Sequence, residues 1–196
     1  MKKSNIILLV VVGIVVVLGL WLWWAYNGMV GQQESATTAF ANVQATYQRR
    51  ADLIPNLTRT VQAYAKHEKS TFTEVTKARA SVSQIHLAAS TATPEQIKKF
   101  DQAQGQLSQA LGKLMLVAER YPELKANENF HDLQIQLEGT ENRINEARQK
   151  YNAAVQTYNQ TVRTMPNALV AGLFGFEKME KFEAAAGAEK APELDL

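Results

Sequence analysis

The sequence predicts an all-α protein in which a single N-terminal transmembrane helix is followed by an antiparallel up-and-down four-helix bundle. Two observations carry this prediction. The stretch "IILLVVVGIVVVLGLWLWW", residues 6–24, contains no charged residue. From Tyr26 onward apolar residues recur at steps of three and four, and no stretch alternates as a half-buried strand does. We divide the chain into a cytoplasmic stub and anchor (1–25), a bundle (26–166), and an amphipathic C-terminal segment with a flexible tail (167–196).

The apolar stretch is long enough to cross a bilayer, since at about 1.5 Å per residue it spans roughly 28 Å. A cleaved signal peptide is the alternative, but its apolar core is usually only about 7 to 15 residues long and ends at small residues. Here a tryptophan, Trp23, occupies one of those positions. Trp21, Trp23 and Trp24 suit an aromatic belt at the membrane interface. We therefore expect a retained anchor and a lipid bilayer as partner.

Charge predicts the orientation of this anchor. Lys2 and Lys3 precede the apolar stretch, and the next basic residues are Arg49 and Arg50. The positive-inside rule therefore predicts a single-pass protein of the inner membrane, with a cytoplasmic N-terminus and a periplasmic bundle. Without those two lysines the 21 basic residues become 19, which equals the 19 acidic ones. A neutral body argues against nucleic acid as a partner.

Four apolar seams predict the helices of the bundle. Thr93, Pro94 and Gln96 match the capping box and first-turn proline that begin a helix, whereas Pro122 and Pro166 end helices. The seams, in chain order, are Val30, Phe40, Val43 and Tyr47; Ile54, Leu57, Val61, Ala65, Phe72, Val75 and Val82; Ile97, Phe100, Leu107, Leu111, Leu114, Ala118 and Tyr121; and Phe130, Leu133, Leu137, Thr140, Ile144, Ala147, Tyr151, Ala154, Tyr158, Val162 and Met165.

The stretch "RRADLIPNL", residues 49–57, interrupts this pattern, and two interpretations remain open. As a corner, Asp52 caps a new helix whose first turn contains Pro55. As a kink, the spacing from Val43 to Leu57 continues in phase through the proline. We favour the corner, because one helix of about 60 residues, near 90 Å long, leaves much of its apolar face uncovered.

The corner places two polar turns, 49–55 and 120–130, at the end of the bundle far from the membrane. We predict a partner-docking tip there, with Arg50 and Tyr121 as its main anchors because arginine and tyrosine dominate interface energetics. The alternative is that Asp52 and the prolines only form two tight corners and that Arg49 or Arg50 only pairs with Glu119 or Glu123. The predicted tip residues are Arg49, Arg50, Asp52, Pro55, Tyr121, Glu123 and Lys125.

No pattern of catalytic, cofactor-binding or metal-ligating residues emerges. His67-Glu68 begins like a zinc-protease helix, but position 71, where the second histidine belongs, is a threonine. A di-iron bundle needs two Glu-x-x-His motifs, and only Glu128 to His131 matches one. The chain has no cysteine, which excludes a thiolate site and a cysteine nucleophile. We expect a protein that is not an enzyme and has no cofactor or metal.

Two further motifs lie on the last long helix. Tyr151-Asn152 and Tyr158-Asn159 repeat after seven residues, which places both tyrosines on the buried seam; we interpret the pair as fixing helix register through polar contacts, with a ligand site as the alternative. In "LEGTENRI", residues 137–144, the charged residues either join Arg49 or Arg50 in a buried network or form a solvated face.

The segment "NALVAGLFGF", residues 167–176, returns to the bilayer in this topology. It is too short to span the membrane, so Phe174 and Phe176 either rest in the membrane interface or cap the base of the bundle. The anchor contains no Gly-x-x-x-Gly motif that specifies a dimer. A homo-oligomer formed through the bundle faces stays open, because the neutral body does not resist association.

Seven motifs follow one another along the chain: "RRADLIPNL", "YAKHE", "EVTKARA", "ERYPELKANENF", "LEGTENRI", "ARQKYNAAVQTYN" and a late "FGF". In these motifs and in their order the chain resembles the LemA family of bacterial membrane-anchored proteins. One departure is "TMPNAL", where Met165 stands in place of the more usual phenylalanine. The resemblance implies one membrane helix followed by an antiparallel helical bundle, and it carries over no catalytic residue.

The expected function is a scaffold or adaptor at the cell envelope, which presents a bundle surface to an unidentified membrane or envelope protein. An anchor and a long bundle without catalytic residues suit such a role. The alternative function is an extracytoplasmic four-helix sensor that binds a small ligand between its helices.

Overall fold

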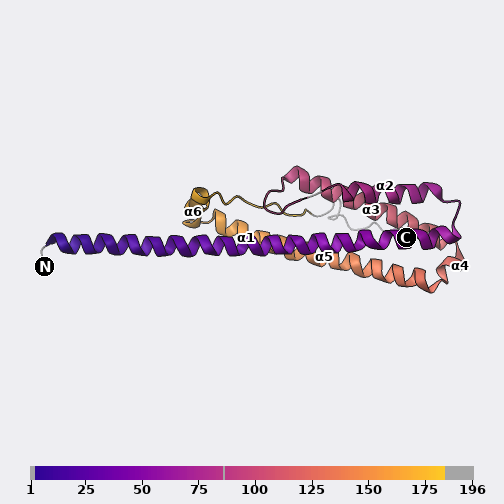
Figure 1. The fold of residues 1–196 in the computed structure, drawn as a ribbon, viewed down its shortest axis with the longest axis horizontal. Helices are drawn as coiled ribbons and strands as arrows, with labels where there is room; N and C mark the ends of the chain where they lie inside the picture. Colours follow the sequence, from indigo (N-terminus) through magenta and orange to yellow (C-terminus); the bar gives the residue numbers. More distant parts are fainter. Residues whose placement is uncertain (1–2, 86, 184–196) are drawn as a thin grey trace, which may run out of the picture.

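The protein is an elongated rod of helices extended at one end by a single bare helix (Figure 1). The computed structural model describes residues 3–85 and 87–183. Lys2 and His86, and the predicted flexible tail over 184–196, lie outside this part. All elements in the described part are helical, as predicted: α1 Lys3–Tyr64, α2 Lys69–Ser83, α3 Pro94–Glu119, α4 Pro122–Lys125, α5 Glu128–Arg163 and α6 Asn167–Phe174.

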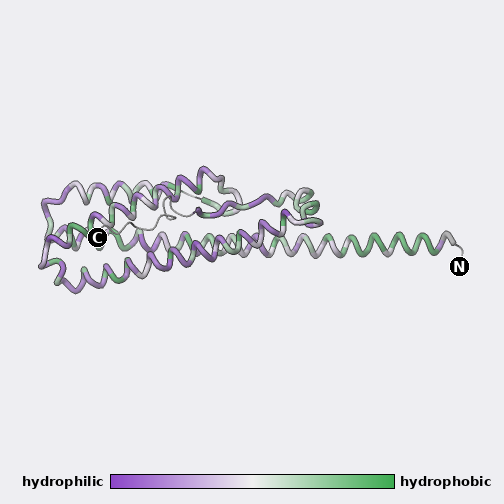
Figure 2. Tube along the Cα trace, turned by 180° about the vertical axis from the view of Figure 1, so that it is seen from behind, coloured by the Kyte–Doolittle hydropathy of each residue, from purple (hydrophilic) through white to green (hydrophobic). Residues whose placement is uncertain are grey.

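The first third of α1 carries the apolar stretch, and nothing in the described part covers it. Its large apolar side chains between Ile6 and Leu20 are 49% to 65% exposed. Figure 2 shows this stretch as the hydrophobic arm that projects from a largely hydrophilic rod. Among the described helices α1 alone is long and apolar enough to cross a membrane. A water-exposed apolar surface of this length is unfavourable, so it suits a lipid environment.

The predicted corner at Asp52 is wrong, because α1 continues through Pro55 and ends at Tyr64. The chain reverses at residues 65–68 instead, where the amide of Glu68 donates to the carbonyl of Ala65. The in-phase spacing of Val43, Tyr47 and Leu57 therefore reflects one continuous helix. The burial argument failed because the 36-residue α5 runs along the same face of α1 and covers it.

The structure also shows how a helix tolerates Pro55. A proline has no amide proton, so the carbonyl four residues earlier, that of Ala51, loses its helical partner. Arg79 on α2 supplies a replacement, since its Nε donates to the Ala51 oxygen at 3.1 Å. A side chain from a neighbouring helix thus satisfies the acceptor that the proline leaves free.

This contact predicts a coupled pair of substitutions. Arg79→Met will lower the free energy of unfolding by about 1 to 2 kcal/mol, because the Ala51 carbonyl is left without a donor. In a Pro55→Ala background the same substitution will cost less, because the alanine amide restores the helical hydrogen bond. Urea denaturation of the four chains of this cycle measures the coupling. Equal costs in both backgrounds would contradict the proposed role of Arg79.

The distal half of the rod is packed around one core to which α1, α2, α3, α4 and α5 all contribute. Residue numbers fall along α5 as they rise along α1: Tyr64 meets Asn127 and Arg50 meets Glu141. The capping box of Thr93 and Gln96 at the start of α3 is present as predicted. Asn127 caps α5 by accepting from the amide of Phe130.

The proximal half of the rod has a different composition. The α2–α3 connection lies beside Gln44, whose side chain donates to the Leu87 carbonyl, so α2 and α3 stop well short of the membrane end. Residues 176–183, which we call the strap, run beyond α6 and fill this space (Figure 1). Met179 and Phe182 of the strap are buried among residues of α1, α3 and α5. Here the irregular strap completes a core to which α1, α3, α5 and α6 contribute.

Candidate functional site

A buried arginine lies at the middle of the rod. Arg50 is 2% exposed, and its Nη1 donates to the Ser108 hydroxyl at 3.0 Å and to the Glu141 carboxylate at 2.9 Å. Its Nη2 donates to the Gln104 side-chain oxygen. The guanidinium thereby joins α1 to α3 and α5. Of the two alternatives for the charged residues of "LEGTENRI", a network with Arg49 or Arg50 and a solvated face, the structure shows Glu141 in contact with Arg50, with the Glu141 side chain 39% exposed.

A second arginine, Arg148, lies about two helical turns after Glu141 on α5. It forms an ion pair with Asp101 at 3.0 Å and donates to the Tyr47 hydroxyl at 3.3 Å. Burial raises the pKa of Asp101 above its ordinary value, although the charge of Arg148 opposes this shift. Burial likewise raises the pKa of Tyr47, again against the effect of Arg148. The pair therefore links α1, α3 and α5 through partly desolvated groups.

The two asparagines of the Tyr-Asn repeat bind the main chain of the strap. Asn152 Nδ2 donates to the Phe182 carbonyl at 2.8 Å, and its Oδ1 accepts from the Phe182 amide at 2.9 Å. Asn159 makes the same pair of contacts with Met179, at 2.8 Å each. Each side-chain amide thus satisfies both polar main-chain groups of one strap residue.

The two tyrosines of the repeat bind main-chain carbonyls of other strap residues. Tyr151 donates to the Glu180 carbonyl at 2.7 Å, and Tyr158 donates to the Glu177 carbonyl at 2.8 Å. Both rings are fully buried on the α5 seam, as predicted. The prediction that the repeat fixes helix register is wrong, because these polar contacts hold a segment that is not a helix.

The strap also docks through its apolar side chains. The Phe182 ring is stacked with Phe40 at a centroid distance of 6.0 Å and lies edge-on to Tyr151 at 5.3 Å. The Arg148 guanidinium lies 4.8 Å from the Phe182 ring centroid and donates to the Glu183 carbonyl at 2.9 Å. We call the set Arg148, Tyr151, Asn152, Tyr158 and Asn159 the ladder, and the surface of α1, α3 and α5 that receives the strap the groove.

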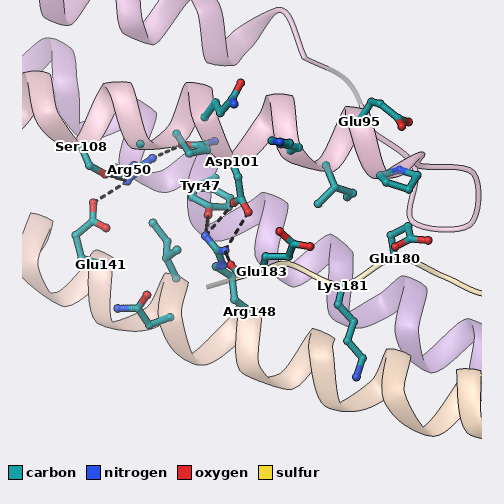
Figure 3. Close-up of a pocket in the computed structure, with 18 residues that line it drawn as sticks. Tyr47, Arg50, Glu95, Asp101, Ser108, Glu141, Arg148, Glu180, Lys181 and Glu183 are labelled. Carbon is teal, nitrogen blue, oxygen red and sulfur yellow. Dashed lines mark hydrogen bonds and ion pairs between the residues drawn. The ribbon is translucent and has the colours of Figure 1, made fainter. Parts of the chain in front are cut away.

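An open pocket of about 670 Å³ adjoins the groove (Figure 3). Figure 3 shows Arg50 and Arg148 on its walls and the strap residues Glu180, Lys181 and Glu183 along one side. Acidic and basic side chains both line it. Within the described part, no group of three or more histidine or carboxylate side chains has a geometry that holds a metal ion.

The structure does not bring the predicted tip residues together. Arg49, Arg50, Asp52 and Pro55 lie within α1, and about 21 Å of helix separates Arg50 from the true turn after Tyr64. Arg50 is buried, and the exposed Asp52 accepts from Gln48 instead of capping a helix. The physical reason is that α1 does not end at the proline.

The other predicted tip residues do lie at the far turn. They are Tyr121, which is partly buried against the distal core, Glu123 and Lys125. Lys125 pairs with Glu119 at 2.6 Å, and Arg120 rather than Arg50 reaches across the tip, to Glu68 at 2.9 Å. The tip of the rod is therefore formed by the turn at 65–68 together with residues 120–127.

The predicted membrane-contacting aromatic residues fall into two groups. Trp21 and Phe176 pack against the proximal core. Trp23, Trp24 and Phe174 are 69%, 71% and 51% exposed. These exposed rings lie where α1 enters the rod, because Phe174 contacts Tyr26 edge-on at 5.0 Å.

Sequence analysis did not identify the strap, although a signal for it is present. Residues 176–183 read Phe-Glu-Lys, Met-Glu-Lys, Phe-Glu, a repeat of three residues. The ladder repeats after seven residues, which on a helix is about 10.5 Å, and three residues of extended chain cover about 9 to 10 Å. The two periods therefore match in length, and this match is what a search for paired repeats would have found.

The ladder predicts a loss of stability at alkaline pH. Burial, reinforced by the charge of Glu180, raises the pKa of Tyr151 from 10.0 to about 12. A raised pKa favours the protonated folded form, so this contribution is complete below pH 10 and is lost as the pH rises towards 12. Tyr151→Phe will flatten the pH dependence of the unfolding free energy in that range. A profile identical to that of the unmodified chain would exclude this role of Tyr151.

The sequence of this chain matches one family model and is similar to named proteins. The family model described as "LemA family" matches residues 39–196. The chain is 28% identical over 180 residues to the magnetosome protein MamQ of Magnetospirillum gryphiswaldense, covering 83% of this chain and 66% of that protein. It is 27% identical to magnetosome protein MamQ 2 of Paramagnetospirillum magneticum, covering 81% and 64%. The chain thus spans about two thirds of the length of these relatives. Because the family model covers most of the rod and the whole ladder, the chain belongs to the LemA family.

Proposed function

We propose that the protein is a non-enzymatic scaffold or adaptor that holds an antiparallel up-and-down helical bundle at a membrane surface and presents it to protein partners. The observation that carries the proposal is α1 itself. Its first third is apolar and uncovered, and its remainder forms one wall of the rod without a break. A continuous helix transmits position and orientation from the bilayer to a tip about 60 Å beyond Tyr26.

The polar groups of the rod support a structural role for its interior. Arg50 and Arg148 each bridge three helices, and the ladder residues bind main-chain groups of the strap. These buried groups are engaged in holding elements together. Partners are therefore expected to dock on outer surfaces of the rod.

Crosslinking in native membranes tests the scaffold. Photoreactive groups placed at exposed positions of the rod will trap a reproducible set of membrane or envelope proteins. A matched chain that keeps the anchor but carries an unrelated helical domain is the control and will not trap that set. If both chains trap the same proteins, the rod has no adaptor function.

We propose further that the protein is a single-pass protein of the inner membrane with its N-terminus in the cytoplasm and the rod in the periplasm. Lys2 and Lys3 before the apolar stretch support this orientation. A reporter active only outside the cytoplasm, fused to the C-terminus, will be active, and a reporter active only inside will not. The reverse pattern would overturn the orientation.

We also propose that α6 touches the bilayer. Leu169, Leu173 and Phe174 are 64%, 74% and 51% exposed beside the exposed Trp23 and Trp24. An apolar collar at the point where a spanning helix leaves the membrane suits the lipid interface.

The cysteine-free chain allows a direct test of the α6 contact. A single cysteine at Phe174 will react with a water-soluble maleimide several-fold more slowly in lipid vesicles than a cysteine at Lys125 on the far tip. Equal rates would exclude contact of α6 with lipid.

The pocket favours a second candidate function, a sensor for a small ligand. Arg50 Nε and Gln104 Nε2 are buried beside it and have no protein partner within the described part. They are donors, so the ligand they favour is an acceptor such as a carboxylate. Screening small carboxylates for a rise in the melting temperature tests this function, with Gln104→Leu as the control variant.

A further inference from the structure

The contacts between the strap and the ladder have the features of a peptide bound in a groove. Four of the six polar contacts made by the Tyr-Asn repeat come from two asparagines that each grip both main-chain groups of one residue. Such contacts require an extended segment and do not depend on the side chains of the residues gripped. Side-chain selection comes from the two places where Met179 and Phe182 are buried.

The strap meets this groove in a strict register. Glu177, Glu180 and Glu183 present their carbonyls to Tyr158, Tyr151 and Arg148 in turn. Met179 lies two residues after Glu177, and Phe182 lies two residues after Glu180. Both side chains are buried in the proximal core. Any segment that binds the ladder must therefore repeat an apolar residue at every third position, as the Phe-Glu-Lys triplets do.

The strap is attached by a connection suited to exchange. Gly175, with a φ of +74°, ends α6 and turns the chain into the strap. The exposed residues of the strap are charged, namely Glu177, Lys178, Lys181 and Glu183, so the outward face of the strap stays hydrated whichever groove it occupies. The distal core is a separate cluster that contains no strap residue, so its packing does not depend on where the strap lies.

We propose that the groove is an exchangeable docking site whose alternative occupant is the strap of a second copy of this chain. This inference rests on the proposed membrane anchoring. Two copies anchored in one bilayer by the same segment hold their grooves and straps at the same height. Confinement to one plane also raises the effective concentration of one strap at its neighbour's groove. The second copy is favoured over an unrelated partner because its strap carries the triplet register and the apolar residues that the groove already buries.

When two copies exchange an identical segment, the interface between them is formed by the same contacts that hold the segment within one copy. Each copy contributes the strap to its neighbour's proximal core, and the ladder keeps the same hydrogen bonds. Reciprocal exchange gives a dimer, and exchange around several copies gives a closed ring or an open row in the plane of the membrane.

Two complementary full-length variants test this inference. The first, Asn152→Ala with Asn159→Ala, keeps the strap and loses the ladder contacts. The second, Met179→Ser with Phe182→Ser, keeps the ladder and loses the strap's apolar residues. Neither variant can exchange with itself, but the strap of the first fits the groove of the second. A chain with all four substitutions is the control.

The variants carry different affinity tags and are reconstituted together in vesicles of phosphatidylethanolamine and phosphatidylglycerol. Capture of the second variant will recover the first roughly tenfold more than the four-substitution chain, given the effective concentration that confinement provides. A peptide of residues 176–183, added in excess, will abolish this recovery, and a scrambled peptide will not. Recovery equal to that of the control would overturn exchange and leave the strap bound only to its own chain.

A measurement on the unmodified chain guards against variants that do not fold. Two wild-type copies with different tags, mixed after separate reconstitution and fusion of the vesicles, will co-purify, and excess peptide 176–183 will reduce their co-purification. Absence of co-purification would also overturn exchange. Sedimentation of the vesicles reports anchoring separately: a chain that does not sediment with lipid contradicts the proposed function, whereas an anchored chain that does not exchange contradicts only this inference.

Discussion

Arg50→Met will lower the free energy of unfolding by about 3 kcal/mol, because a buried hydrogen-bond network loses its centre. The substitution preserves much of the side-chain volume and removes the donors that now reach Gln104, Ser108 and Glu141. Gln104 is 4% exposed, so its oxygen cannot recover a full set of water contacts. Glu141 is 39% exposed and is partly rehydrated, which keeps the expected loss below that of a fully buried ion pair.

The adjacent arginine is the matched control. Arg49 is exposed, and Arg49→Met will change stability by less than about 0.5 kcal/mol. A further variant separates lost polar contacts from a poor fit: Arg50→Met combined with Gln104→Leu and Glu141→Leu will recover most of the loss, because the two side chains that lose their donor are gone and water can reach the exposed Ser108 hydroxyl. Urea denaturation of the full chain in detergent measures all three. Equal effects of the two single substitutions would contradict the network.

Phe182→Ala will destabilise the chain by about 3 to 4 kcal/mol, because it opens a cavity between α1, α3 and α5. It also removes the cation–π contact with Arg148. Lys178→Ala changes an exposed residue of the same strap and will have little effect. Hydrogen exchange distinguishes a local from a global change: the Met179 amide will lose protection in Phe182→Ala, while the distal core helices keep theirs. Uniform loss of protection would contradict a proximal core that is separate from the distal one.

Much of the helical architecture was predictable because the signals for it are local. The capping box at Thr93 and the seams of α3 and α5 depend on spacing within one helix, and they are present as predicted. The exception on the α5 seam is Met165, which lies beyond the end of the helix and is 64% exposed. The location of the first reversal was not predictable in this way. Pro55 signals a helix end locally, and the replacement donor for the Ala51 carbonyl comes from Arg79, 28 positions after Ala51.

The contacts of Arg50 and of the Tyr-Asn repeat also depend on residues far away in the sequence. Arg50 is predicted from the sequence to be an exposed anchor, yet Gln104, Ser108 and Glu141 contact it from two other helices. The Tyr-Asn repeat was recognised, but its partners lie about 20 to 30 positions later in a segment that reads as an amphipathic tail. In both cases the missing information is a pairing between distant segments, which helical periodicity does not contain.

The distance between the two ends of the rod's α1 wall tests the account most directly. Nitroxide labels on single cysteines at Asn27 and Ala63, in the otherwise cysteine-free chain reconstituted in lipid nanodiscs, are separated by ten turns of one helix. Pulsed electron spin resonance will give a distance of about 54 Å if α1 runs unbroken from the bilayer to the tip. A distance near 25 Å would show that the chain reverses near Asp52, and it would contradict the continuous helix on which the anchored rod depends.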